Sequence, residues 1–165
     1  MKPLKIYVAG KIAKESGFGS HHWRDEFCQK LQSLSGLDLV SLDPLSGESS
    51  TQGYEEIFGK DCKLIEQSDV FVVYLSDDIS VGGSQEILIA KYLNKPVIGF
   101  APYGGKFNMA TREMFGKKIT DYKDPFVFST CDVVCGTIEE VADSLNNLSK
   151  IKVKDITLID EAIRG

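Results

Sequence analysis

Asp61 and Glu86 are the residues whose type and spacing most strongly indicate chemistry. Each lies on the apolar stripe of a predicted helix, because residues three and four apart share one helix face. Asp61 falls between Ile57 and Leu64, and Glu86 shares its face with Ile89. An ionised carboxylate in an apolar site costs several kcal/mol or shifts its pKa. Two carboxylates in one cleft are also the arrangement that glycoside cleavage uses, one as nucleophile and one as acid or base.

Glu86 has both a functional and a structural interpretation. It follows Gly82-Gly83-Ser84 and is predicted in the first turn of its helix. A helix N-terminus favours a carboxylate by about 0.3–1 kcal/mol, which keeps Glu86 ionised and available as a nucleophile. The glycines let a ligand approach the backbone closely, and free amides there can hold a phosphate or a hydroxyl. In the structural interpretation, Glu86 only caps its own helix.

Asp61 is predicted in the middle of its helix, where capping cannot explain it. Its structural alternative is a buried ion pair, with Lys11 or a tyrosine as the partner. Tyr7 is a mid-strand aromatic residue, a type that is more often part of a core. Lys11 directly follows Gly10 at the end of the first predicted strand, where it would face a ligand cleft.

Composition narrows the class of protein. The 165 residues suit one domain over residues 1–150, with residues 151–165 as a C-terminal tail or short helix. A hydrophobic content of 42% and a charged content of 26% are ordinary for a globular protein. The net charge of −5 argues against binding polymeric nucleic acid through a basic surface. The net charge does not exclude a small anionic or neutral ligand, because a local site can oppose it.

From the sequence we expect neither a membrane-spanning helix nor a signal peptide. The chain has no run of about 18 apolar residues, and its start is too short for a signal peptide. Four cysteines form no Cys-x-x-Cys pair, which favours a reducing, cytoplasmic location: Cys28, Cys62, Cys131 and Cys135. Cys131 and Cys135 with two adjacent histidines make a poor zinc set, and we expect neither a metal nor another cofactor.

Apolar runs alternate with helical patterns along the chain. Strands are expected over 6–9, 37–42, 70–75, 97–100 and either 125–128 or 133–134. Helices are expected over about 20–35, 53–68, 84–93 and 137–148, with a polar loop at 76–83 and a mostly irregular segment at 101–125 that includes a short helix near 111–115. This alternation predicts an α/β, flavodoxin-like (Rossmann-like) three-layer fold with a five-stranded parallel sheet. Ligands bind such sheets beyond the carboxyl ends of the strands, where Lys11 and Glu86 would be neighbours.

Three segments together resemble a known family. They are Ile6-Tyr7-Val-Ala-Gly10, then Asp61-x7-Asp69-Val-Phe-Val-Val, then Gly82-x3-Glu86-Ile-x2-Ala90-x4-Lys95-Pro96-Val. In order and spacing, over roughly residues 5–100, they resemble the nucleoside 2-deoxyribosyltransferase family, including its 2'-deoxynucleoside 5'-monophosphate N-hydrolase branch. The resemblance implies a flavodoxin-like enzyme that cleaves an N-glycosidic bond.

The resemblance also implies roles for three residues. Glu86 would attack C1′ of the sugar to give a glycosyl-enzyme, and Tyr7 would orient Glu86 through its hydroxyl. Asp61 would lie beside the base and assist proton transfer to the leaving nitrogen. The intermediate would then pass to another nucleobase or to water.

One departure from the family pattern separates the two branches. In the transferases an Asp commonly lies six residues before the catalytic Glu and binds the sugar 5′-hydroxyl, whereas this chain has Ser80. A hydroxyl would not repel a phosphate, and Lys11 and the backbone of Gly82, Gly83 and Ser84 would suit one. Transfer of deoxyribose between bases stays the first expectation, and hydrolysis of 5′-monophosphates is the alternative.

The family resemblance further implies sites that a neighbouring subunit completes. Asn108 is the candidate for that contact, and we expect a homodimer or a higher homo-oligomer. A non-catalytic module that binds nucleotides is the second alternative, although binding alone does not need a mid-helix Asp such as Asp61.

Overall fold

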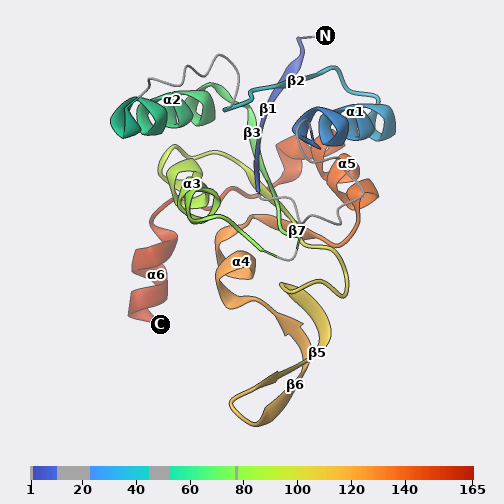
Figure 1. Cartoon of the computed structure of the whole chain (residues 1–165), viewed down its shortest axis with the longest axis vertical. Coiled ribbons are helices and arrows are strands. Elements are labelled where there is room, and N and C mark those ends of the chain that lie inside the picture. The colour runs from blue at the N-terminus through green and yellow to red at the C-terminus, as the bar shows by residue number, and fades with distance from the viewer. Residues whose placement is uncertain (1, 11–22, 45–52, 77) are drawn as a thin grey trace.

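A five-stranded parallel sheet forms the centre of the protein. The structure is a computed structural model that describes residues 2–10, 23–44, 53–76 and 78–165. The strand order is β2-β1-β3-β4-β7 (Figure 1). The strands are β1 (Leu4–Gly10), β2 (Leu39–Ser41), β3 (Val70–Tyr74), β4 (Val97–Phe100) and β7 (Val133–Cys135). This is the flavodoxin-like order, so the predicted fold class is confirmed.

Helices cover both faces of the sheet and make three layers. Buried side chains of α1 (Trp23–Ser35) and α5 (Ile138–Asn146) pack on one face. Those of α2 (Tyr54–Gln67), α3 (Val81–Tyr92) and α4 (Pro125–Thr130) pack on the other. A 3-10 turn, η1 (Leu148–Lys150), and a final helix, α6 (Leu158–Arg164), end the chain.

Each face of the sheet carries a hydrophobic core: the first core lies under α1 and α5, and the second core lies under α2, α3 and α4. Side chains of β1 alternate between these two cores, because successive residues of a strand point to opposite faces. Ile6 and Val8 face α1 and α5, whereas Tyr7 and Ala9 face α2 and α3, and all four are buried. All five residues of β3 are buried, as its continuous apolar run predicts. Tyr7 is therefore the one polar side chain that β1 sends into the second core.

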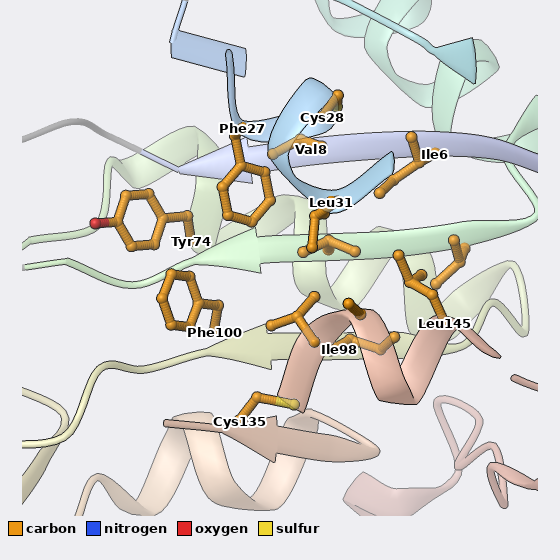
Figure 2. Close-up of a cluster of buried hydrophobic side chains, with 14 of the residues drawn as sticks. Ile6, Val8, Phe27, Cys28, Leu31, Tyr74, Ile98, Phe100, Cys135 and Leu145 are labelled. Atoms are coloured by element: carbon orange, nitrogen blue, oxygen red, sulfur yellow. The ribbon is translucent and has the colours of Figure 1, made fainter. Parts of the chain in front are cut away.

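Stacked aromatic rings fill the first core at the carboxyl ends of the strands. The Tyr74 ring lies 4.9 Å from that of Phe100 and 5.7 Å from that of Phe27 on α1 (Figure 2). Such pairs contribute about 0.5–1.5 kcal/mol beyond their buried area. Trp23 packs against the same group and is buried. This end of the sheet is therefore rigidly packed on the side away from Tyr7.

The segment after β4 contains an antiparallel hairpin, so the expected short helix near 111–115 is wrong. Strands β5 (Asn108–Met114) and β6 (Lys117–Lys123) pair with each other and project from the body (Figure 1). Phe115 and Gly116 form the turn, with φ values of 52° and 71°. Two central residues with positive φ are typical of the two-residue hairpin turn, but a phenylalanine there is unusual.

The fifth strand is β7, so of the two expected positions 133–134 is confirmed and 125–128 is wrong. Asp124 caps a helix instead, because its Oδ1 accepts hydrogen bonds from the amides of Phe126 at 3.0 Å and Val127 at 3.1 Å. Pro125 at the first helical position suits this start, since its missing N–H needs no partner there.

The helices, the cysteines and the C-terminal segment each bear on an expectation from the sequence. None of the helices in the described part of the chain has the length and apolar character to cross a membrane. All four cysteines are free thiols; the cytoplasmic location inferred from them stays a prediction. Residues 158–164 form the short helix α6, while the domain boundary at residue 150 remains a prediction.

Candidate functional site

The ends of β1 and β3 approach each other so closely that glycine is required. Gly10 pairs with Tyr74, has a φ of +139°, and a Cβ added to it would lie 2.5 Å from the Tyr74 carbonyl oxygen. A Cβ on Gly83 would lie 3.1 Å from Ser80 Oγ and 3.8 Å from the Gly10 nitrogen. The N-terminus of α3 therefore lies beside the carboxyl end of β1, as ligand sites of this topology require.

Helix α3 begins earlier than expected, which moves Glu86 out of its first turn. Ser80 is the N-cap, and its Oγ accepts a hydrogen bond from the Gly83 amide at 3.0 Å. The helix therefore starts at Val81 inside the predicted 76–83 loop, and Glu86 lies in the second turn. The helix dipole acts mainly within the first turn, so it does not explain the presence of a carboxylate at Glu86.

Tyr7 and Glu86 form the central contact of the site. The Tyr7 hydroxyl donates a hydrogen bond to Glu86 Oε1 across 3.1 Å, joining residues 79 positions apart. The ring of Tyr7 is fully buried and stacks on Phe71 with centroids 5.4 Å apart. Burial raises the pKa of Tyr7 far above its usual value, and the carboxylates of Glu86 and Asp61 raise it further. The hydroxyl therefore keeps its proton and remains a donor.

Glu86 is a half-buried carboxyl group whose pKa is raised. Burial is the largest cause, and the negative charge of Asp61 adds to it. The hydrogen bond from Tyr7 and the positive charge of Arg24 act in the opposite direction. Perturbed titrating groups gather at functional sites because burial and like charges are arranged there to tune reactivity. The expectation that its helix alone keeps Glu86 ionised is thus replaced by a balance between burial and three neighbouring groups, Asp61, Tyr7 and Arg24.

Asp61 reaches the same site from α2, but its surroundings are less apolar than expected. Asp61 is half-buried, while Ile57 and Phe58 before it are 39% and 59% exposed. Only Ile65, one turn later, is completely buried. Asp61 is nevertheless close enough to raise the pKa of both Tyr7 and Glu86. The predicted pair of carboxylates is therefore present, at the rim of the second core rather than inside it.

Four further residues were predicted to bind substrate: Gly82, Ser84, Asn108 and Lys11. Gly82 lies at the site, because a Cβ added to it would be 3.9 Å from Glu86 Oε1. Ser84 donates to the Val81 carbonyl at 2.8 Å and is exposed. Asn108 is buried at the base of the hairpin, where its amide donates to the Ala101 carbonyl at 3.2 Å. Lys11 lies outside the described residues.

Two residues of the family-like pattern have structural contacts. Asp69 accepts a hydrogen bond from the Lys5 amide at 2.8 Å and so joins the starts of β3 and β1. Lys95 donates to the carbonyls of Glu66 at 2.6 Å and Ser68 at 2.8 Å, which caps the end of α2. Both contacts help to fix the helix that carries Asp61.

Arg24 is the site residue that sequence analysis missed. It lies in the first turn of α1, and its Nε donates to the Val8 carbonyl at 2.9 Å. A cation there is opposed by the helix dipole, and this mismatch was the available signal. Because its partner is a backbone carbonyl on a distant strand, no local pattern predicts the contact.

Comparison with known proteins identifies the fold. The sequence matches no protein-family model and no curated protein. A conserved protein from Enterococcus faecalis has a TM-score of 0.65 at 16% identity, with 89% of this chain and 99% of that one covered. A 2-deoxyribosyltransferase from Bacillus psychrosaccharolyticus has a TM-score of 0.54 at 17% identity, covering 92% and 98%. The 2-deoxyribosyltransferase from Leishmania mexicana has a TM-score of 0.54 at 20% identity, covering 87% and 96%. The chain shares the fold of these proteins.

The chemistry available at the site follows from its groups. Glu86 is a carboxylate held in one orientation by a neutral donor, Tyr7. Asp61 is a second carboxyl group that disfavours ionisation of the first. Two carboxyl groups in one site are the arrangement that glycoside cleavage uses, one as nucleophile and one as acid or base. The site can therefore attack an electrophilic carbon and protonate its leaving group.

Proposed function

We propose that this protein cleaves the N-glycosidic bond of 2'-deoxynucleosides and transfers the deoxyribose to another nucleobase. The observation that carries the proposal is the 3.1 Å hydrogen bond from the buried Tyr7 hydroxyl to Glu86, with Asp61 acting on both groups. The fold shared with two 2-deoxyribosyltransferases supports it. The family resemblance of residues 5–100 assigns the same three residues to this reaction.

The proposed first step breaks the bond between C1′ and the base. A carboxylate oxygen of Glu86 attacks C1′, and the electron pair of the glycosidic bond leaves on the base nitrogen. In the proposed reactive form the two carboxyl groups hold one proton between them, carried by Asp61, and Asp61 gives it to this nitrogen. The products are a free base and a deoxyribosyl ester of Glu86, which is the covalent intermediate of a retaining mechanism.

The proposed second step reverses the first with a different base. A nitrogen of the incoming base attacks C1′, its proton returns to Asp61, and Glu86 leaves as a carboxylate. Tyr7 donates to Glu86 in the free enzyme and releases it when the ester forms. The buried ring of Tyr7 and its stacking on Phe71 keep the hydroxyl in place throughout.

Ser80 favours a second candidate reaction at the same site, hydrolysis of nucleoside 5′-monophosphates. Its hydroxyl lies at the N-terminus of α3, where a phosphate is stabilised by backbone amides and the helix dipole. A carboxylate at this position would repel a phosphate, whereas the hydroxyl of Ser80 can still donate while it caps Gly83. Water would then take the place of the incoming base.

Chromatography of base release separates the two reactions. The protein is given deoxynucleosides and deoxynucleoside monophosphates separately, each with and without a second free base. A new nucleoside that appears only with the acceptor base supports transfer. Free base released mainly from monophosphates, without exchange, supports hydrolysis. No turnover of any substrate, together with retained nucleotide binding, would instead identify a non-catalytic binding module.

We also propose that the protein is a homodimer or higher homo-oligomer with shared sites, as the family resemblance implies. Support comes from an apolar cavity of about 530 Å³ between α2 and α3. Phe58 and Tyr92 line it and are 59% and 75% exposed. Exposed apolar patches of this kind mark contact surfaces. Sedimentation velocity should show that Tyr92→Asp dissociates the assembly, whereas Phe126→Asp on α4, where Phe126 is 81% exposed, should not.

A further inference from the structure

The carbonyl of Val8 lies just beyond the last hydrogen bond that joins β1 to the segment of β2. The last backbone contact of β2 with β1 is from the Leu42 amide to the Ile6 carbonyl at 2.8 Å. Carbonyls two residues apart on a strand point to the same neighbour, so Val8 faces the same side, and among the described residues no strand pairs with it there. A buried carbonyl needs a donor, and Arg24 Nε provides it at 2.9 Å.

The side chain of Arg24 is held at two points. In addition to the bond to Val8, its guanidinium lies 4.6 Å from the ring centroid of Trp23, which is itself buried against Phe27 and Tyr74. A planar guanidinium that is bonded and stacked keeps its charge in one place. Among the ion pairs within the described residues, none involves Arg24. Its charge is therefore not consumed by a neighbouring carboxylate there.

Val8 directly follows Tyr7 in β1. Arg24 therefore binds the backbone of the residue next to Tyr7, whose hydroxyl contacts Glu86. We propose that Arg24 is a positioning residue of this site: it supplies the hydrogen-bond donor that a neighbouring strand would give to Val8, fixes the backbone that carries Tyr7, and places a permanent positive charge near Glu86. This inference rests on the proposed function for its meaning in catalysis. The structural link itself, from Arg24 through Val8 and Tyr7 to Glu86, is independent of the substrate.

The groups that face Glu86 show why a positive charge matters. Tyr7 faces it from β1, and Asp61 and Cys62 from α2; Arg24 acts on it from α1. Among the described groups named here, Arg24 is the one permanent cation. Burial and Asp61 favour the protonated form of Glu86, and Arg24 and the Tyr7 hydrogen bond favour the carboxylate that a nucleophile requires. Losing Arg24 should therefore raise the pKa of Glu86 further.

Two variants separate the charge of Arg24 from its hydrogen bond. Arg24→Gln removes the charge but keeps an N–H donor for Val8, whereas Arg24→Lys keeps the charge but loses the planar fork. Arg112→Gln is the matched control, because Arg112 also stacks on a ring, that of Tyr122 at 4.4 Å, but in the hairpin. Both Arg24 substitutions are conservative, and thermal melts show whether each variant is folded.

The titration of Glu86 is followed by carbon NMR on protein with labelled glutamate side chains, with Glu86→Gln to assign the signal. We expect Arg24→Gln to move the Glu86 titration and the acidic limb of kcat/KM to higher pH, and Arg24→Lys to leave the titration nearly unchanged. A displacement of about 1 Å at an active site can cost about a hundredfold in rate, so Arg24→Lys should lower kcat/KM by about tenfold to a hundredfold. Arg112→Gln should change neither.

The outcomes distinguish this inference from the proposed function. If Arg24→Gln titrates at the same pH as the wild type and Arg24→Lys keeps full activity, the role of Arg24 is refuted. If the wild type turns over no nucleoside or nucleotide, the proposed function fails, and the NMR titration still decides whether Arg24 sets the charge state of Glu86. Should Arg24→Gln not fold, an unchanged pH profile and rate in Arg24→Lys would be enough to overturn the inference.

Discussion

Helix α3 carries two charged residues, Lys91 and Glu86, that differ in how their charges are paired. Lys91, near its end, is completely buried and forms an ion pair with Asp132, whose side chain is also inaccessible. Lys91 donates a further bond to the Lys154 carbonyl at 2.9 Å. Asp132 accepts bonds from the amides of Val97 and Lys154, each at 2.7 Å. Both charges are thus surrounded by partners.

Glu86, a turn and a half earlier on the same helix, is half-buried, and among the described residues its side chain has one hydrogen-bond partner. Its bond comes from a neutral hydroxyl, and a second carboxyl group lies nearby. A buried ion pair with all its hydrogen bonds made has nothing left to react with. Within the described residues Glu86 accepts one side-chain hydrogen bond and lies beside a like charge, which raises its pKa and leaves an oxygen available for chemistry. The comparison indicates which charge on α3 is structural and which is suited to chemistry.

The largest effect should come from Glu86→Gln. This substitution keeps the shape and the contact with Tyr7 but removes the nucleophilic oxygen, so turnover should fall by about 10⁴-fold or more. Nucleotide binding should survive, which calorimetry would measure. Glu140→Gln is the matched control, since Glu140 also accepts a bond from a tyrosine, Tyr103, at 3.2 Å, on the surface. Full activity in the Glu86→Gln protein would remove the distinction between the two charges.

Next in size is the loss of stability on breaking the structural pair. Lys91→Met leaves Asp132 as a buried charge without its cation, which costs about 3–5 kcal/mol in unfolding free energy. Urea denaturation measures it. The control is Lys123→Met, because Lys123 and Asp121 form an exposed pair at 2.7 Å that should contribute at most about 1 kcal/mol. Equal losses in the two variants would show that burial does not set the value of the Lys91 pair.

The sequence predicts the sheet better than it predicts the contacts that complete it. The apolar runs of β1 and β3 are long and continuous, so their position and the flavodoxin-like class follow directly. The hairpin was missed because most of its residues are exposed and its turn uses Phe115 with positive φ rather than Asn-Gly. Nothing in the local pattern of residues 108–123 separates a strand from an irregular loop.

The site shows the same division. Periodicity placed Asp61 and Glu86 on helix faces, but the contact between Tyr7 and Glu86 came from the family resemblance, because it joins residues 79 positions apart. The Lys91 and Asp132 pair, 41 positions apart, and the bond from Arg24 to Val8 were not predicted at all. Long-range pairing depends on where the sheet brings distant segments together, and single-sequence patterns carry little information on this.

A smaller effect is expected from Tyr7→Phe, which tests whether the neutral donor makes Glu86 reactive. Removing one preorganised hydrogen-bond donor from an active site costs about a hundredfold in rate. The pKa of Glu86 should rise further, because the bond from Tyr7 lowers it. The acidic limb of the pH profile of kcat/KM should therefore move to higher pH. Tyr103→Phe, which removes the surface tyrosine bond to Glu140, should leave both rate and profile unchanged.

The smallest effect concerns the free energy of unfolding rather than the rate, and its sign should differ between substitutions at Glu86 and at Lys91. The pKa of Glu86 is raised in the folded protein, so its contribution to stability is present below the usual carboxyl pKa and is lost as pH rises through the raised value. Glu86→Gln, which never ionises, should therefore be at least as stable as the wild type at neutral pH. The difference should disappear in acid, as urea unfolding at a series of pH values would show. Lys91→Met should be less stable at neutral pH, so opposite signs at the two positions would show that only the charge at Glu86 is held at a cost to stability. If Glu86→Gln instead lowers stability as Lys91→Met does, Glu86 is a structural carboxylate and does not differ from Lys91 in this respect.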